Sequence, residues 1–448
     1  MSQPFSITAQ LEWLKRQPFT RLRQVRQQPE VADVAGAVAR ELRKLSVIER
    51  IPKGGRVAVA VGSRGIGQLF EITKTAIQTL SQMGFAPFVV AAMGSHGGAT
   101  SEGQRELLGQ YGISAERLGV PVRTEMDVAV LGQNDVGESV YWDKNALAAD
   151  GVITISRIKA HTDFTSTFES GIVKMLVIGL GKREGAQTHH RYGVRGLRDI
   201  LPRSLPIVLE KTRFVAGLAI VENAAGQPAL IEAVPRERVI EREPQLLAKA
   251  KELAGKLPFD ALDLLVVGEL GKNYSGTGMD VHVLGRHFVE GVPDLWKPSI
   301  TRICVLDLSP ESDGNAVGAG LADLVTDRLI AKTDAAKTRM NYLTSCFLLR
   351  AKVPLGFPTD RECIAAGLQT CWQPKLEALR AAVIPNTLEL NELWVTPTLA
   401  LEARERRDLQ ITGLERPLAF DAQGSLSQAE LFPDSWQARR TISGPIHV

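Results

Sequence analysis

The stretch RVAVAVGSRGIG, residues 56–67, decides the fold class of this chain. Its first six residues form an aliphatic run typical of a buried parallel strand, and a glycine-rich turn follows directly. Phe70–Met83 then has apolar residues at helical spacing. A strand, a glycine-rich turn and a helix in this order predict one unit of an α/β fold.

The same order recurs along the next two hundred residues. Phe88–Ala92 is an expected strand, Gly94–Thr100 (GSHGGAT) a glycine-rich turn, and Ser101–Tyr111 a helix in which Ser101 and Gln104 have capping-box spacing. Alternating strands and helices predict a mostly parallel sheet, whose loops at the strand carboxyl ends meet at one edge. The other elements expected here are strands at Val128–Leu131, Gly151–Ile155 and Phe214–Glu222 and helices at Val31–Leu45 and Lys144–Ala149.

A second series of strands and helices begins near Phe259, after a charged helix expected at Arg238–Leu257. We therefore predict two α/β domains, residues 1–258 and 259–448, with mostly parallel sheets. The tail from about Pro417 has weak patterning, and we expect it to be irregular. In the second domain the expected strands are Asp263–Gly268, Ile303–Leu308 and Leu388–Val395, and the expected helices are Gly318–Ile330, Ala335–Leu349, Arg361–Gln369 and Pro374–Ala382.

Composition excludes several classes of protein. The 448 residues are 44% hydrophobic, and 53 basic and 50 acidic residues give a net charge of only +3, which indicates neither a nucleic-acid nor a membrane partner. The four cysteines contain no CxxC pair, which is typical of reduced thiols. Residues 1–20 do not resemble a signal peptide, and no apolar run is long enough to span a bilayer. We expect a soluble cytoplasmic protein.

Residues 157–191, RIKAHTDFTSTFESGIVKMLVIGLGKREGAQTHHR, concentrate the groups that can do chemistry. They hold three of the seven histidines, and Lys174 is the single charged residue of the apolar run Ser170–Leu180. A hydrated ammonium in such a run is paired with an anion, bonded covalently, or extended to solvent. The residues alone leave these alternatives open.

The glycine-rich turns carry two candidates for ligand contact. His96 is flanked by Ser95, Gly97 and Gly98, which have little bulk to bury it, and an imidazole presented there can act as acid or base. Arg64 offers a planar fork that matches a carboxylate or phosphate, although an ordinary surface arginine fits the same position.

The remaining candidates, Lys159, His161, His189 and His190, follow the expected strand Gly151–Ile155. His161 comes after Lys159, a cation that suits a phosphate or simply solvates the loop. His189 and His190 are adjacent and would point about 100° apart on a helix, so at most one is expected to act at a given site. None of these spacings is typical of a structural zinc centre.

The turn VAVAVGSRGIG is also similar to the dinucleotide-binding turn of short-chain dehydrogenases. Those enzymes need a tyrosine with a lysine four residues later, and none of the five tyrosines has one. A nicotinamide-dependent oxidoreductase is therefore an alternative that lacks its proton-transfer pair. A binding protein that keeps the fold without catalysis is a third interpretation.

Five motifs follow one another along the chain: Arg64, GSHGGAT with His96, KAHTDF with His161, ESGIVK with Lys174, and GAQTHH with His190. This order resembles the nickel-dependent lactate racemase family over residues 56–191 and, more loosely, over GELGKNYSGTGMD, residues 268–280. The resemblance implies two α/β domains with the active site between them, and an isomerase. It also implies a nickel pincer nucleotide, a pyridinium-3,5-bisthiocarboxylic acid mononucleotide joined to a lysine as a thioamide.

Carried over residue by residue, the resemblance implies that Lys174 is the covalent attachment site and His190 the nickel ligand, with His189 as the alternative. His96 and His161 become an acid/base pair that faces a 2-hydroxy acid from opposite sides. One histidine would take the hydroxyl proton while a hydride leaves Cα for the cofactor, and the hydride would return on the other face. Arg64 is implied as an anchor for the substrate or cofactor, and the further implied cofactor contacts are Ser95, Gly97, Gly98 and Lys159.

The chain also departs from the family pattern. Val61 stands where the family has an aspartate, the stretch from His161 to Lys174 is longer and poorer in glycine, and Lys272 and Asn273 are the only candidates for second-domain substrate contacts. We expect Val61 and the loop 272–280 to favour a larger or more polar 2-hydroxy acid than lactate. The implied partners are this acid and, transiently, the enzymes that build the cofactor; a homo-oligomer is compatible with the sequence.

Overall fold

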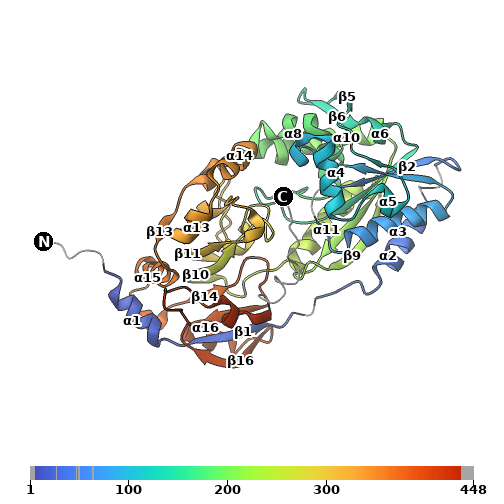
Figure 1. The fold of residues 1–448 in the computed structure, drawn as a ribbon. Helices are drawn as coiled ribbons and strands as arrows, with labels where there is room; N and C mark the ends of the chain where they lie inside the picture. Colours follow the sequence, from blue (N-terminus) through green and yellow to red (C-terminus); the bar gives the residue numbers. More distant parts are fainter. Residues whose placement is uncertain (1–5, 27, 47, 49–50, 63–64, 435–448) are drawn as a thin grey trace. The chain divides into compact units, whose positions relative to one another are not determined.

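The computed structural model describes residues 6–26, 28–46, 48, 51–62 and 65–434 (Figure 1). The chain divides into two compact units, Gln28–Ala254 and the pair of segments Met1–Gln27 and Gly255–Val448. Each unit is built on one largely parallel sheet, which confirms the predicted α/β class. The division differs from the predicted domain 1–258 at its start, because strand β1 (Phe19–Gln24) pairs with β15 and β16 of the later unit.

The six-stranded sheet of the Gln28–Ala254 unit has the order β4-β3-β2-β7-β8-β9. Only β9 runs antiparallel to its neighbour. Because β3 and β7 both pair with β2 in parallel, the loops that follow these three strands leave the sheet at one edge, as the sequence predicts. The strands are β2 (Arg56–Val61), β3 (Ala86–Ala91), β4 (Val122–Arg123), β7 (Gly151–Arg157), β8 (Phe214–Glu222) and β9 (Pro228–Pro235).

Strand β2 shows why this sheet has helices on both faces. Successive side chains point to opposite faces, so Ala58 and Ala60 pack into one apolar core and Val57, Val59 and Val61 into another. The valine-side core is covered by α2 (Val34–Arg43), α3 (Leu69–Gln82) and α4 (Ser101–Gln110). The alanine-side core is covered by α7 (Ile172–Lys174), α8 (Lys182–His190), α10 (Leu201–Lys211) and α11 (Val239–Leu253).

Two details of this unit differ from the predictions. The strand expected at Val128–Leu131 exists as β5 (Val128–Gln133), but it forms an antiparallel hairpin with β6 (Ser139–Asp143) and takes no part in the parallel sheet. None of its residues is buried, so it lacks the two-sided burial of a parallel strand. The N-cap of α4 is Thr100, whose hydroxyl accepts from the amide of Gly103 at 3.0 Å, and not Ser101.

The other unit has an eight-stranded sheet of order β13-β12-β11-β10-β14-β15-β1-β16. Its first five strands are parallel, and the last three are antiparallel to their neighbours. Residues of α12, α13 and α16 pack in the core on one face, and residues of α1 and α15 in the core on the other. The elements are β10 (Ala261–Leu270), β11 (Ser299–Leu308), β12 (Leu324–Thr326), β13 (Leu355–Phe357), β14 (Ala381–Ile384), β15 (Glu392–Val395), β16 (Leu409–Arg416), α1 (Thr8–Arg16), α12 (Val281–Leu284), α13 (Asp327–Lys332), α14 (Ala335–Ser345), α15 (Asp360–Thr370) and α16 (Pro397–Ala403).

Two helices predicted in this unit are wrong in part. Gly318–Ile330 contains strand β12 before helix α13 begins, and Pro374–Ala382 runs into strand β14. All residues of both strands are buried. A short run that is buried on both faces shows no alternation, so its periodicity does not distinguish a strand from a helix.

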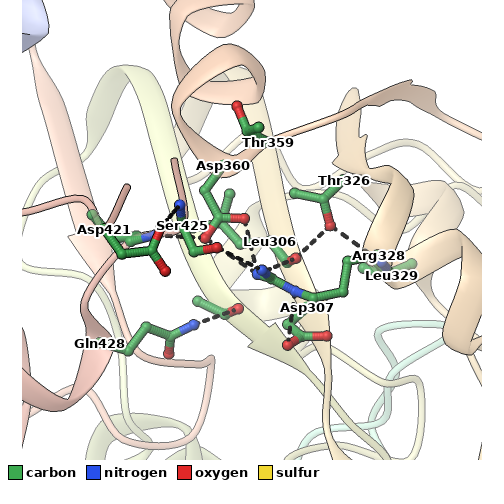
Figure 2. Close-up of polar contacts among 12 residues, drawn as sticks. Leu306, Asp307, Thr326, Arg328, Leu329, Thr359, Asp360, Asp421, Ser425 and Gln428 are labelled. Atoms are coloured by element: carbon green, nitrogen blue, oxygen red, sulfur yellow. Dashed lines mark hydrogen bonds and ion pairs between the residues drawn. The ribbon is translucent and has the colours of Figure 1, made fainter. Parts of the chain in front are cut away.

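An arginine network holds the segment that follows β16, which was expected to be irregular. Figure 2 shows Arg328 bonding the carboxylate of Asp360, the hydroxyl of Ser425 and the carbonyl of Leu306. The bond from Arg328 to Asp360 is 2.9 Å long. The second carboxylate oxygen of Asp360 accepts from the amide of Leu426 at 2.7 Å. The segment is therefore tied to the carboxyl end of β11 and the start of α15 by directed polar contacts.

Candidate functional site

Lys174 and His190 lie on successive helical segments of one stretch, residues 172–190. Helix α7 ends at Lys174 and passes directly into a π-helical turn, Met175–Gly179. A turn at residues 180–181 and a positive φ of 54° at Lys182 separate this segment from α8, which ends at His190. A π-helical turn inside a helix is uncommon and is frequent at functional sites. The sequence predicted an apolar run here, but not this local widening of the helix.

A buried glutamate of α11 fixes the start of this helical stretch. The Oε2 atom of Glu243 accepts from the amide of Val173 at 2.9 Å. Burial raises the pKa of Glu243 to about 7, while its hydrogen bonds from the amides of Val173 and Ile172 oppose that shift. A Cβ on Gly171 would lie 2.3 Å from Oε1, so glycine is needed where the carboxyl meets the chain. In the sequence Glu243 is hidden among the other charged residues of α11 and gives no signal of its role.

His161 contacts Lys174 directly. Its Nε2 lies 2.7 Å from Lys174 Nζ, and its Nδ1 accepts from the amide of Asp163 at 3.2 Å. The imidazole stacks on the ring of Phe164 with centroids 4.4 Å apart, and only 7% of the residue is exposed. The loop after β7 therefore places this ring against the candidate attachment lysine in one fixed orientation.

A second buried carboxylate holds the loop of His161. Glu169 Oε2 accepts from the amide of His161 at 2.7 Å, and Oε1 accepts from the amide of Ser166 at 3.0 Å. Lys251 of α11 pairs with the same carboxylate at 2.6 Å. Because the carboxylate of Glu169 accepts hydrogen bonds from the amides of His161 and Ser166, residues 161–169 form a closed loop that orients the imidazole of His161.

The two adjacent histidines have different environments. The His189 ring is buried, with Nδ1 2.8 Å from the carbonyl of Gly185 and Nε2 3.3 Å from the hydroxyl of Ser204. The half-buried ring of His190 has its pKa lowered to about 4, first by burial and then by the nearby charge of Lys174. Both ring nitrogens of His189 thus contact neighbouring groups of the fold, whereas the ring of His190 is close enough to Lys174 for that charge to lower its pKa.

His96 lies on the loop between β3 and α4 and is exposed. Gly97 and Gly98 both have positive φ, at 66° and 62°. A Cβ on Gly97 would lie 2.5 Å from the backbone of Gly103, so this glycine permits close packing on α4; a Cβ on Gly98 would meet no atom within 4 Å. Of the two, only Gly98 has open space beside its backbone, and Ser95 is half-buried.

In the turn after β2, the side chain of Glu222 occupies a place where the sequence predicted a bound anionic ligand. Arg64 lies outside the described residues. Downstream of it, the amide of Gly67 donates to Glu222 Oε1 at 2.6 Å, and Arg157 pairs with Glu222 Oε2 at 2.6 Å. Val61 is fully buried in the core beneath α3, and the expectation that its bulk favours a larger acid stays a prediction.

The other residues predicted to bind cofactor or substrate, Lys159, Lys272 and Asn273, bond to neighbouring loop and helix residues in the structure. Lys159 forms a backbone bridge with Ser170 across the loop of His161. Lys272 and Asn273 belong to the other unit, where Lys272 Nζ donates to the side chain of Asn341 at 2.9 Å and the side chain of Asn273 accepts from Ser309 at 2.8 Å. Those contacts stabilise the loop after β10.

In the part of the chain that the structure covers, no group of three or more His, Cys, Asp and Glu side chains could hold a metal ion. In the same residues, every helix is too short or too polar to cross a bilayer.

Comparison with known proteins points to one family. Residues 14–197 match the family described as the lactate racemase N-terminal domain, a segment that contains His96, His161, Lys174 and His190. The chain is similar in structure to the lactate racemase apoprotein from Thermoanaerobacterium thermosaccharolyticum, with 10% identity and a TM-score of 0.44 over 74% of this chain and 85% of that one. No curated protein matches the sequence. Over residues 14–197, this chain is therefore similar to the lactate racemase N-terminal domain.

Proposed function

We propose that this protein is a racemase or epimerase of a 2-hydroxy acid that works with a lysine-tethered nickel pincer nucleotide. The observation that carries the proposal is the grouping of Lys174, His161 and His190 within one unit, inside the segment that matches the lactate racemase N-terminal domain. The family match supports an isomerase. The cofactor and the substrate class belong to the proposal.

The donor groups fit the proposed cofactor. A metal ligand must present a neutral imidazole, and a pKa of about 4 keeps His190 neutral at neutral pH. Lys174 offers a primary amine beside it for covalent attachment. When bound, a nickel pincer nucleotide supplies an acceptor and donor of hydride.

The chain's own residues then supply proton transfer and placement. His161 is held by Glu169, Asp163 and Phe164, so its ring can exchange a proton with a substrate hydroxyl without reorienting. His96 is exposed on the loop that follows β3. This loop starts at the same edge of the sheet as the loop of His161, and β3 and β7 lie on either side of β2. Two imidazoles on loops from β3 and β7 suit a reaction in which either enantiomer must lose its hydroxyl proton.

The second candidate function, a nicotinamide-dependent oxidoreductase, has less support. In dinucleotide-binding turns the backbone amides near the helix start face a pyrophosphate. Here the amide of Gly67 is engaged by Glu222, and a carboxylate at that place repels a phosphate. The oxidoreductase therefore lacks the Tyr–Lys pair for proton transfer, and the Gly67 amide that would bind its cofactor phosphate is already bonded to Glu222.

The experiment is production of the full chain together with the enzymes that build the cofactor, followed by intact mass spectrometry and nickel analysis. We expect an added mass on Lys174, one nickel per chain, and interconversion of the enantiomers of a 2-hydroxy acid in a chiral chromatography screen. Lys174→Ala should lose the added mass, whereas the control variant Lys144→Ala, at an exposed position outside the site, should keep it. An unmodified wild-type chain without nickel would contradict the proposal.

A further inference from the structure

A buried lysine that the sequence did not single out lies at the start of helix α8. Lys182 is 0% exposed, and its Nζ donates to the carbonyl of Ala91 at 2.6 Å and lies 3.4 Å from Gln104 Oε1. Asp143 Oδ2 is 3.2 Å away, at ion-pair distance but without good hydrogen-bond geometry. A fully buried ammonium is rare unless its charge and donors are all used, so this lysine has a specific task.

The contacts of Lys182 converge on the loop of His96. Ala91 is the last residue of β3, from which that loop departs. Gln104, which Lys182 contacts, donates from Nε2 to the carbonyl of Gly94 at 3.0 Å and to that of His96 at 3.3 Å. Lys182 therefore holds the loop at its root directly and at its histidine through one intermediate side chain.

The same loop packs on the π-helical turn that follows Lys174. The amide of Gly94 donates to the carbonyl of Gly179 at 3.1 Å, and a Cβ on Gly179 would lie 2.7 Å from the carbonyl of Ala92. The loop of His96 and the helical stretch that carries Lys174 and His190 are therefore joined twice, through the backbone at Gly179 and through the ammonium of Lys182.

We propose that Lys182 is a positioning residue that fixes the His96 loop against the helical stretch of Lys174 and His190, with Gln104 as its relay. An apolar side chain could fill the same volume but could not bond two carbonyl oxygens. Burial lowers the pKa of Lys182 and raises the pKa of Asp143, while each charge opposes the shift of the other. This inference rests on the proposed function for the role of His96, but not for the contacts themselves.

Two variants test the anchor while they preserve the fold. Lys182→Met combined with Asp143→Asn removes the buried pair without leaving one charge alone, and asparagine can still accept from the amide of Ala146 as Asp143 does at 2.7 Å. Gln104→Met leaves the Lys182–Asp143 pair intact and removes only the hydrogen bonds from Gln104 to the carbonyls of Gly94 and His96 and its contact with Lys182. Lys144→Met, at an exposed position of the short helix α6 (Lys144–Leu147), is the matched control.

Hydrogen exchange of residues 92–100 and the NMR titration of His96 in the protein without cofactor are the first measurements. We expect faster exchange of these residues and a shifted His96 titration in both test variants, and wild-type behaviour in the control. In protein loaded with cofactor, both test variants should retain the added mass and nickel but lose about tenfold or more in kcat, because misplacing an acid/base group by about 1 Å has effects of this size.

Unchanged exchange and an unchanged His96 titration in both test variants would overturn the assignment. If the combined variant does not fold, Gln104→Met alone decides, because it leaves the ion pair in place. Failure of the proposed function shows separately, as absence of nickel and added mass in the wild-type chain, and does not affect the exchange and titration measurements.

Discussion

His161 Nε2 lies 2.7 Å from Lys174 Nζ while His161 Nδ1 accepts from the amide of Asp163. A neutral imidazole carries one N–H, and an amide that donates to Nδ1 places that hydrogen on Nε2. The carboxylate of Asp163 lies 3.6 Å from Nδ1, beyond hydrogen-bond range, so Nε2 is the ring nitrogen that faces Lys174. His161 is therefore placed to exchange a proton with Lys174 when the lysine reacts.

The first prediction is that Lys174 is unusually reactive toward acylating reagents. With p-nitrophenyl acetate at pH 7, the amine should form an amide and release p-nitrophenol. Peptide mass spectrometry should show Lys174 acetylated at least about tenfold faster than the exposed Lys144, since an ordinary lysine is almost entirely protonated at this pH. His161→Gln should remove the difference. Equal acetylation of Lys174 in the wild type and in His161→Gln would contradict the argument.

The second prediction separates the two adjacent histidines. His189→Ala should lower the free energy of unfolding by about 2 kcal/mol, because it empties a buried site and leaves the hydroxyl of Ser204 and the carbonyl of Gly185 without this partner. His190→Ala should change stability by less than about 1 kcal/mol but abolish nickel binding in chains produced with the cofactor-building enzymes. Urea unfolding and nickel analysis of both variants check this, and the reverse pattern would make His189 the ligand.

The sequence predicts most of the sheet around the candidate site and little of what orients the site. Strands β2 and β8 have the predicted bounds, because β2 lies between Gly55 and Gly62 and the apolar run of β8 lies between Arg213 and Glu222. The roles of Lys182 and Glu243 could not be predicted, because a buried charge is recognised only by partners that are distant in sequence. Lys182 is 78 residues from Gln104, and Glu243 is 70 residues from Val173.

The third prediction concerns the arginine network of Figure 2. Asp360→Ala removes a carboxylate that is 1% exposed and bonds both Arg328 and the amide of Leu426. We expect a loss of about 2 kcal/mol, less than for a fully buried pair because the side chain of Arg328 is 35% exposed. Hydrogen exchange should accelerate in residues 417–434. Lys332→Ala, which removes a partly exposed partner of Asp307, is the control and should change stability by less than about 0.5 kcal/mol.

The fourth prediction is a pH dependence that comes from Glu243. Its pKa is about 7 in the folded protein and 4.5 ordinarily, so the folded state binds a proton that the unfolded state releases between these pH values. The contribution of this carboxyl to stability is therefore fully present below about pH 4.5 and is lost as pH rises through 7. Because glutamine does not titrate, Glu243→Gln should gain about 2 kcal/mol relative to the wild type between pH 5 and pH 8.

Urea unfolding of both proteins across this pH range measures the difference. Glu241→Gln removes an exposed carboxylate from the same helix and controls for the change in net charge. Parallel stability curves for Glu243→Gln and the wild type would mean that Glu243 stays ionised in the fold. The amides of Val173 and Ile172, at the start of the helical stretch that carries Lys174, would then be held by a charged carboxylate and not by a neutral acid.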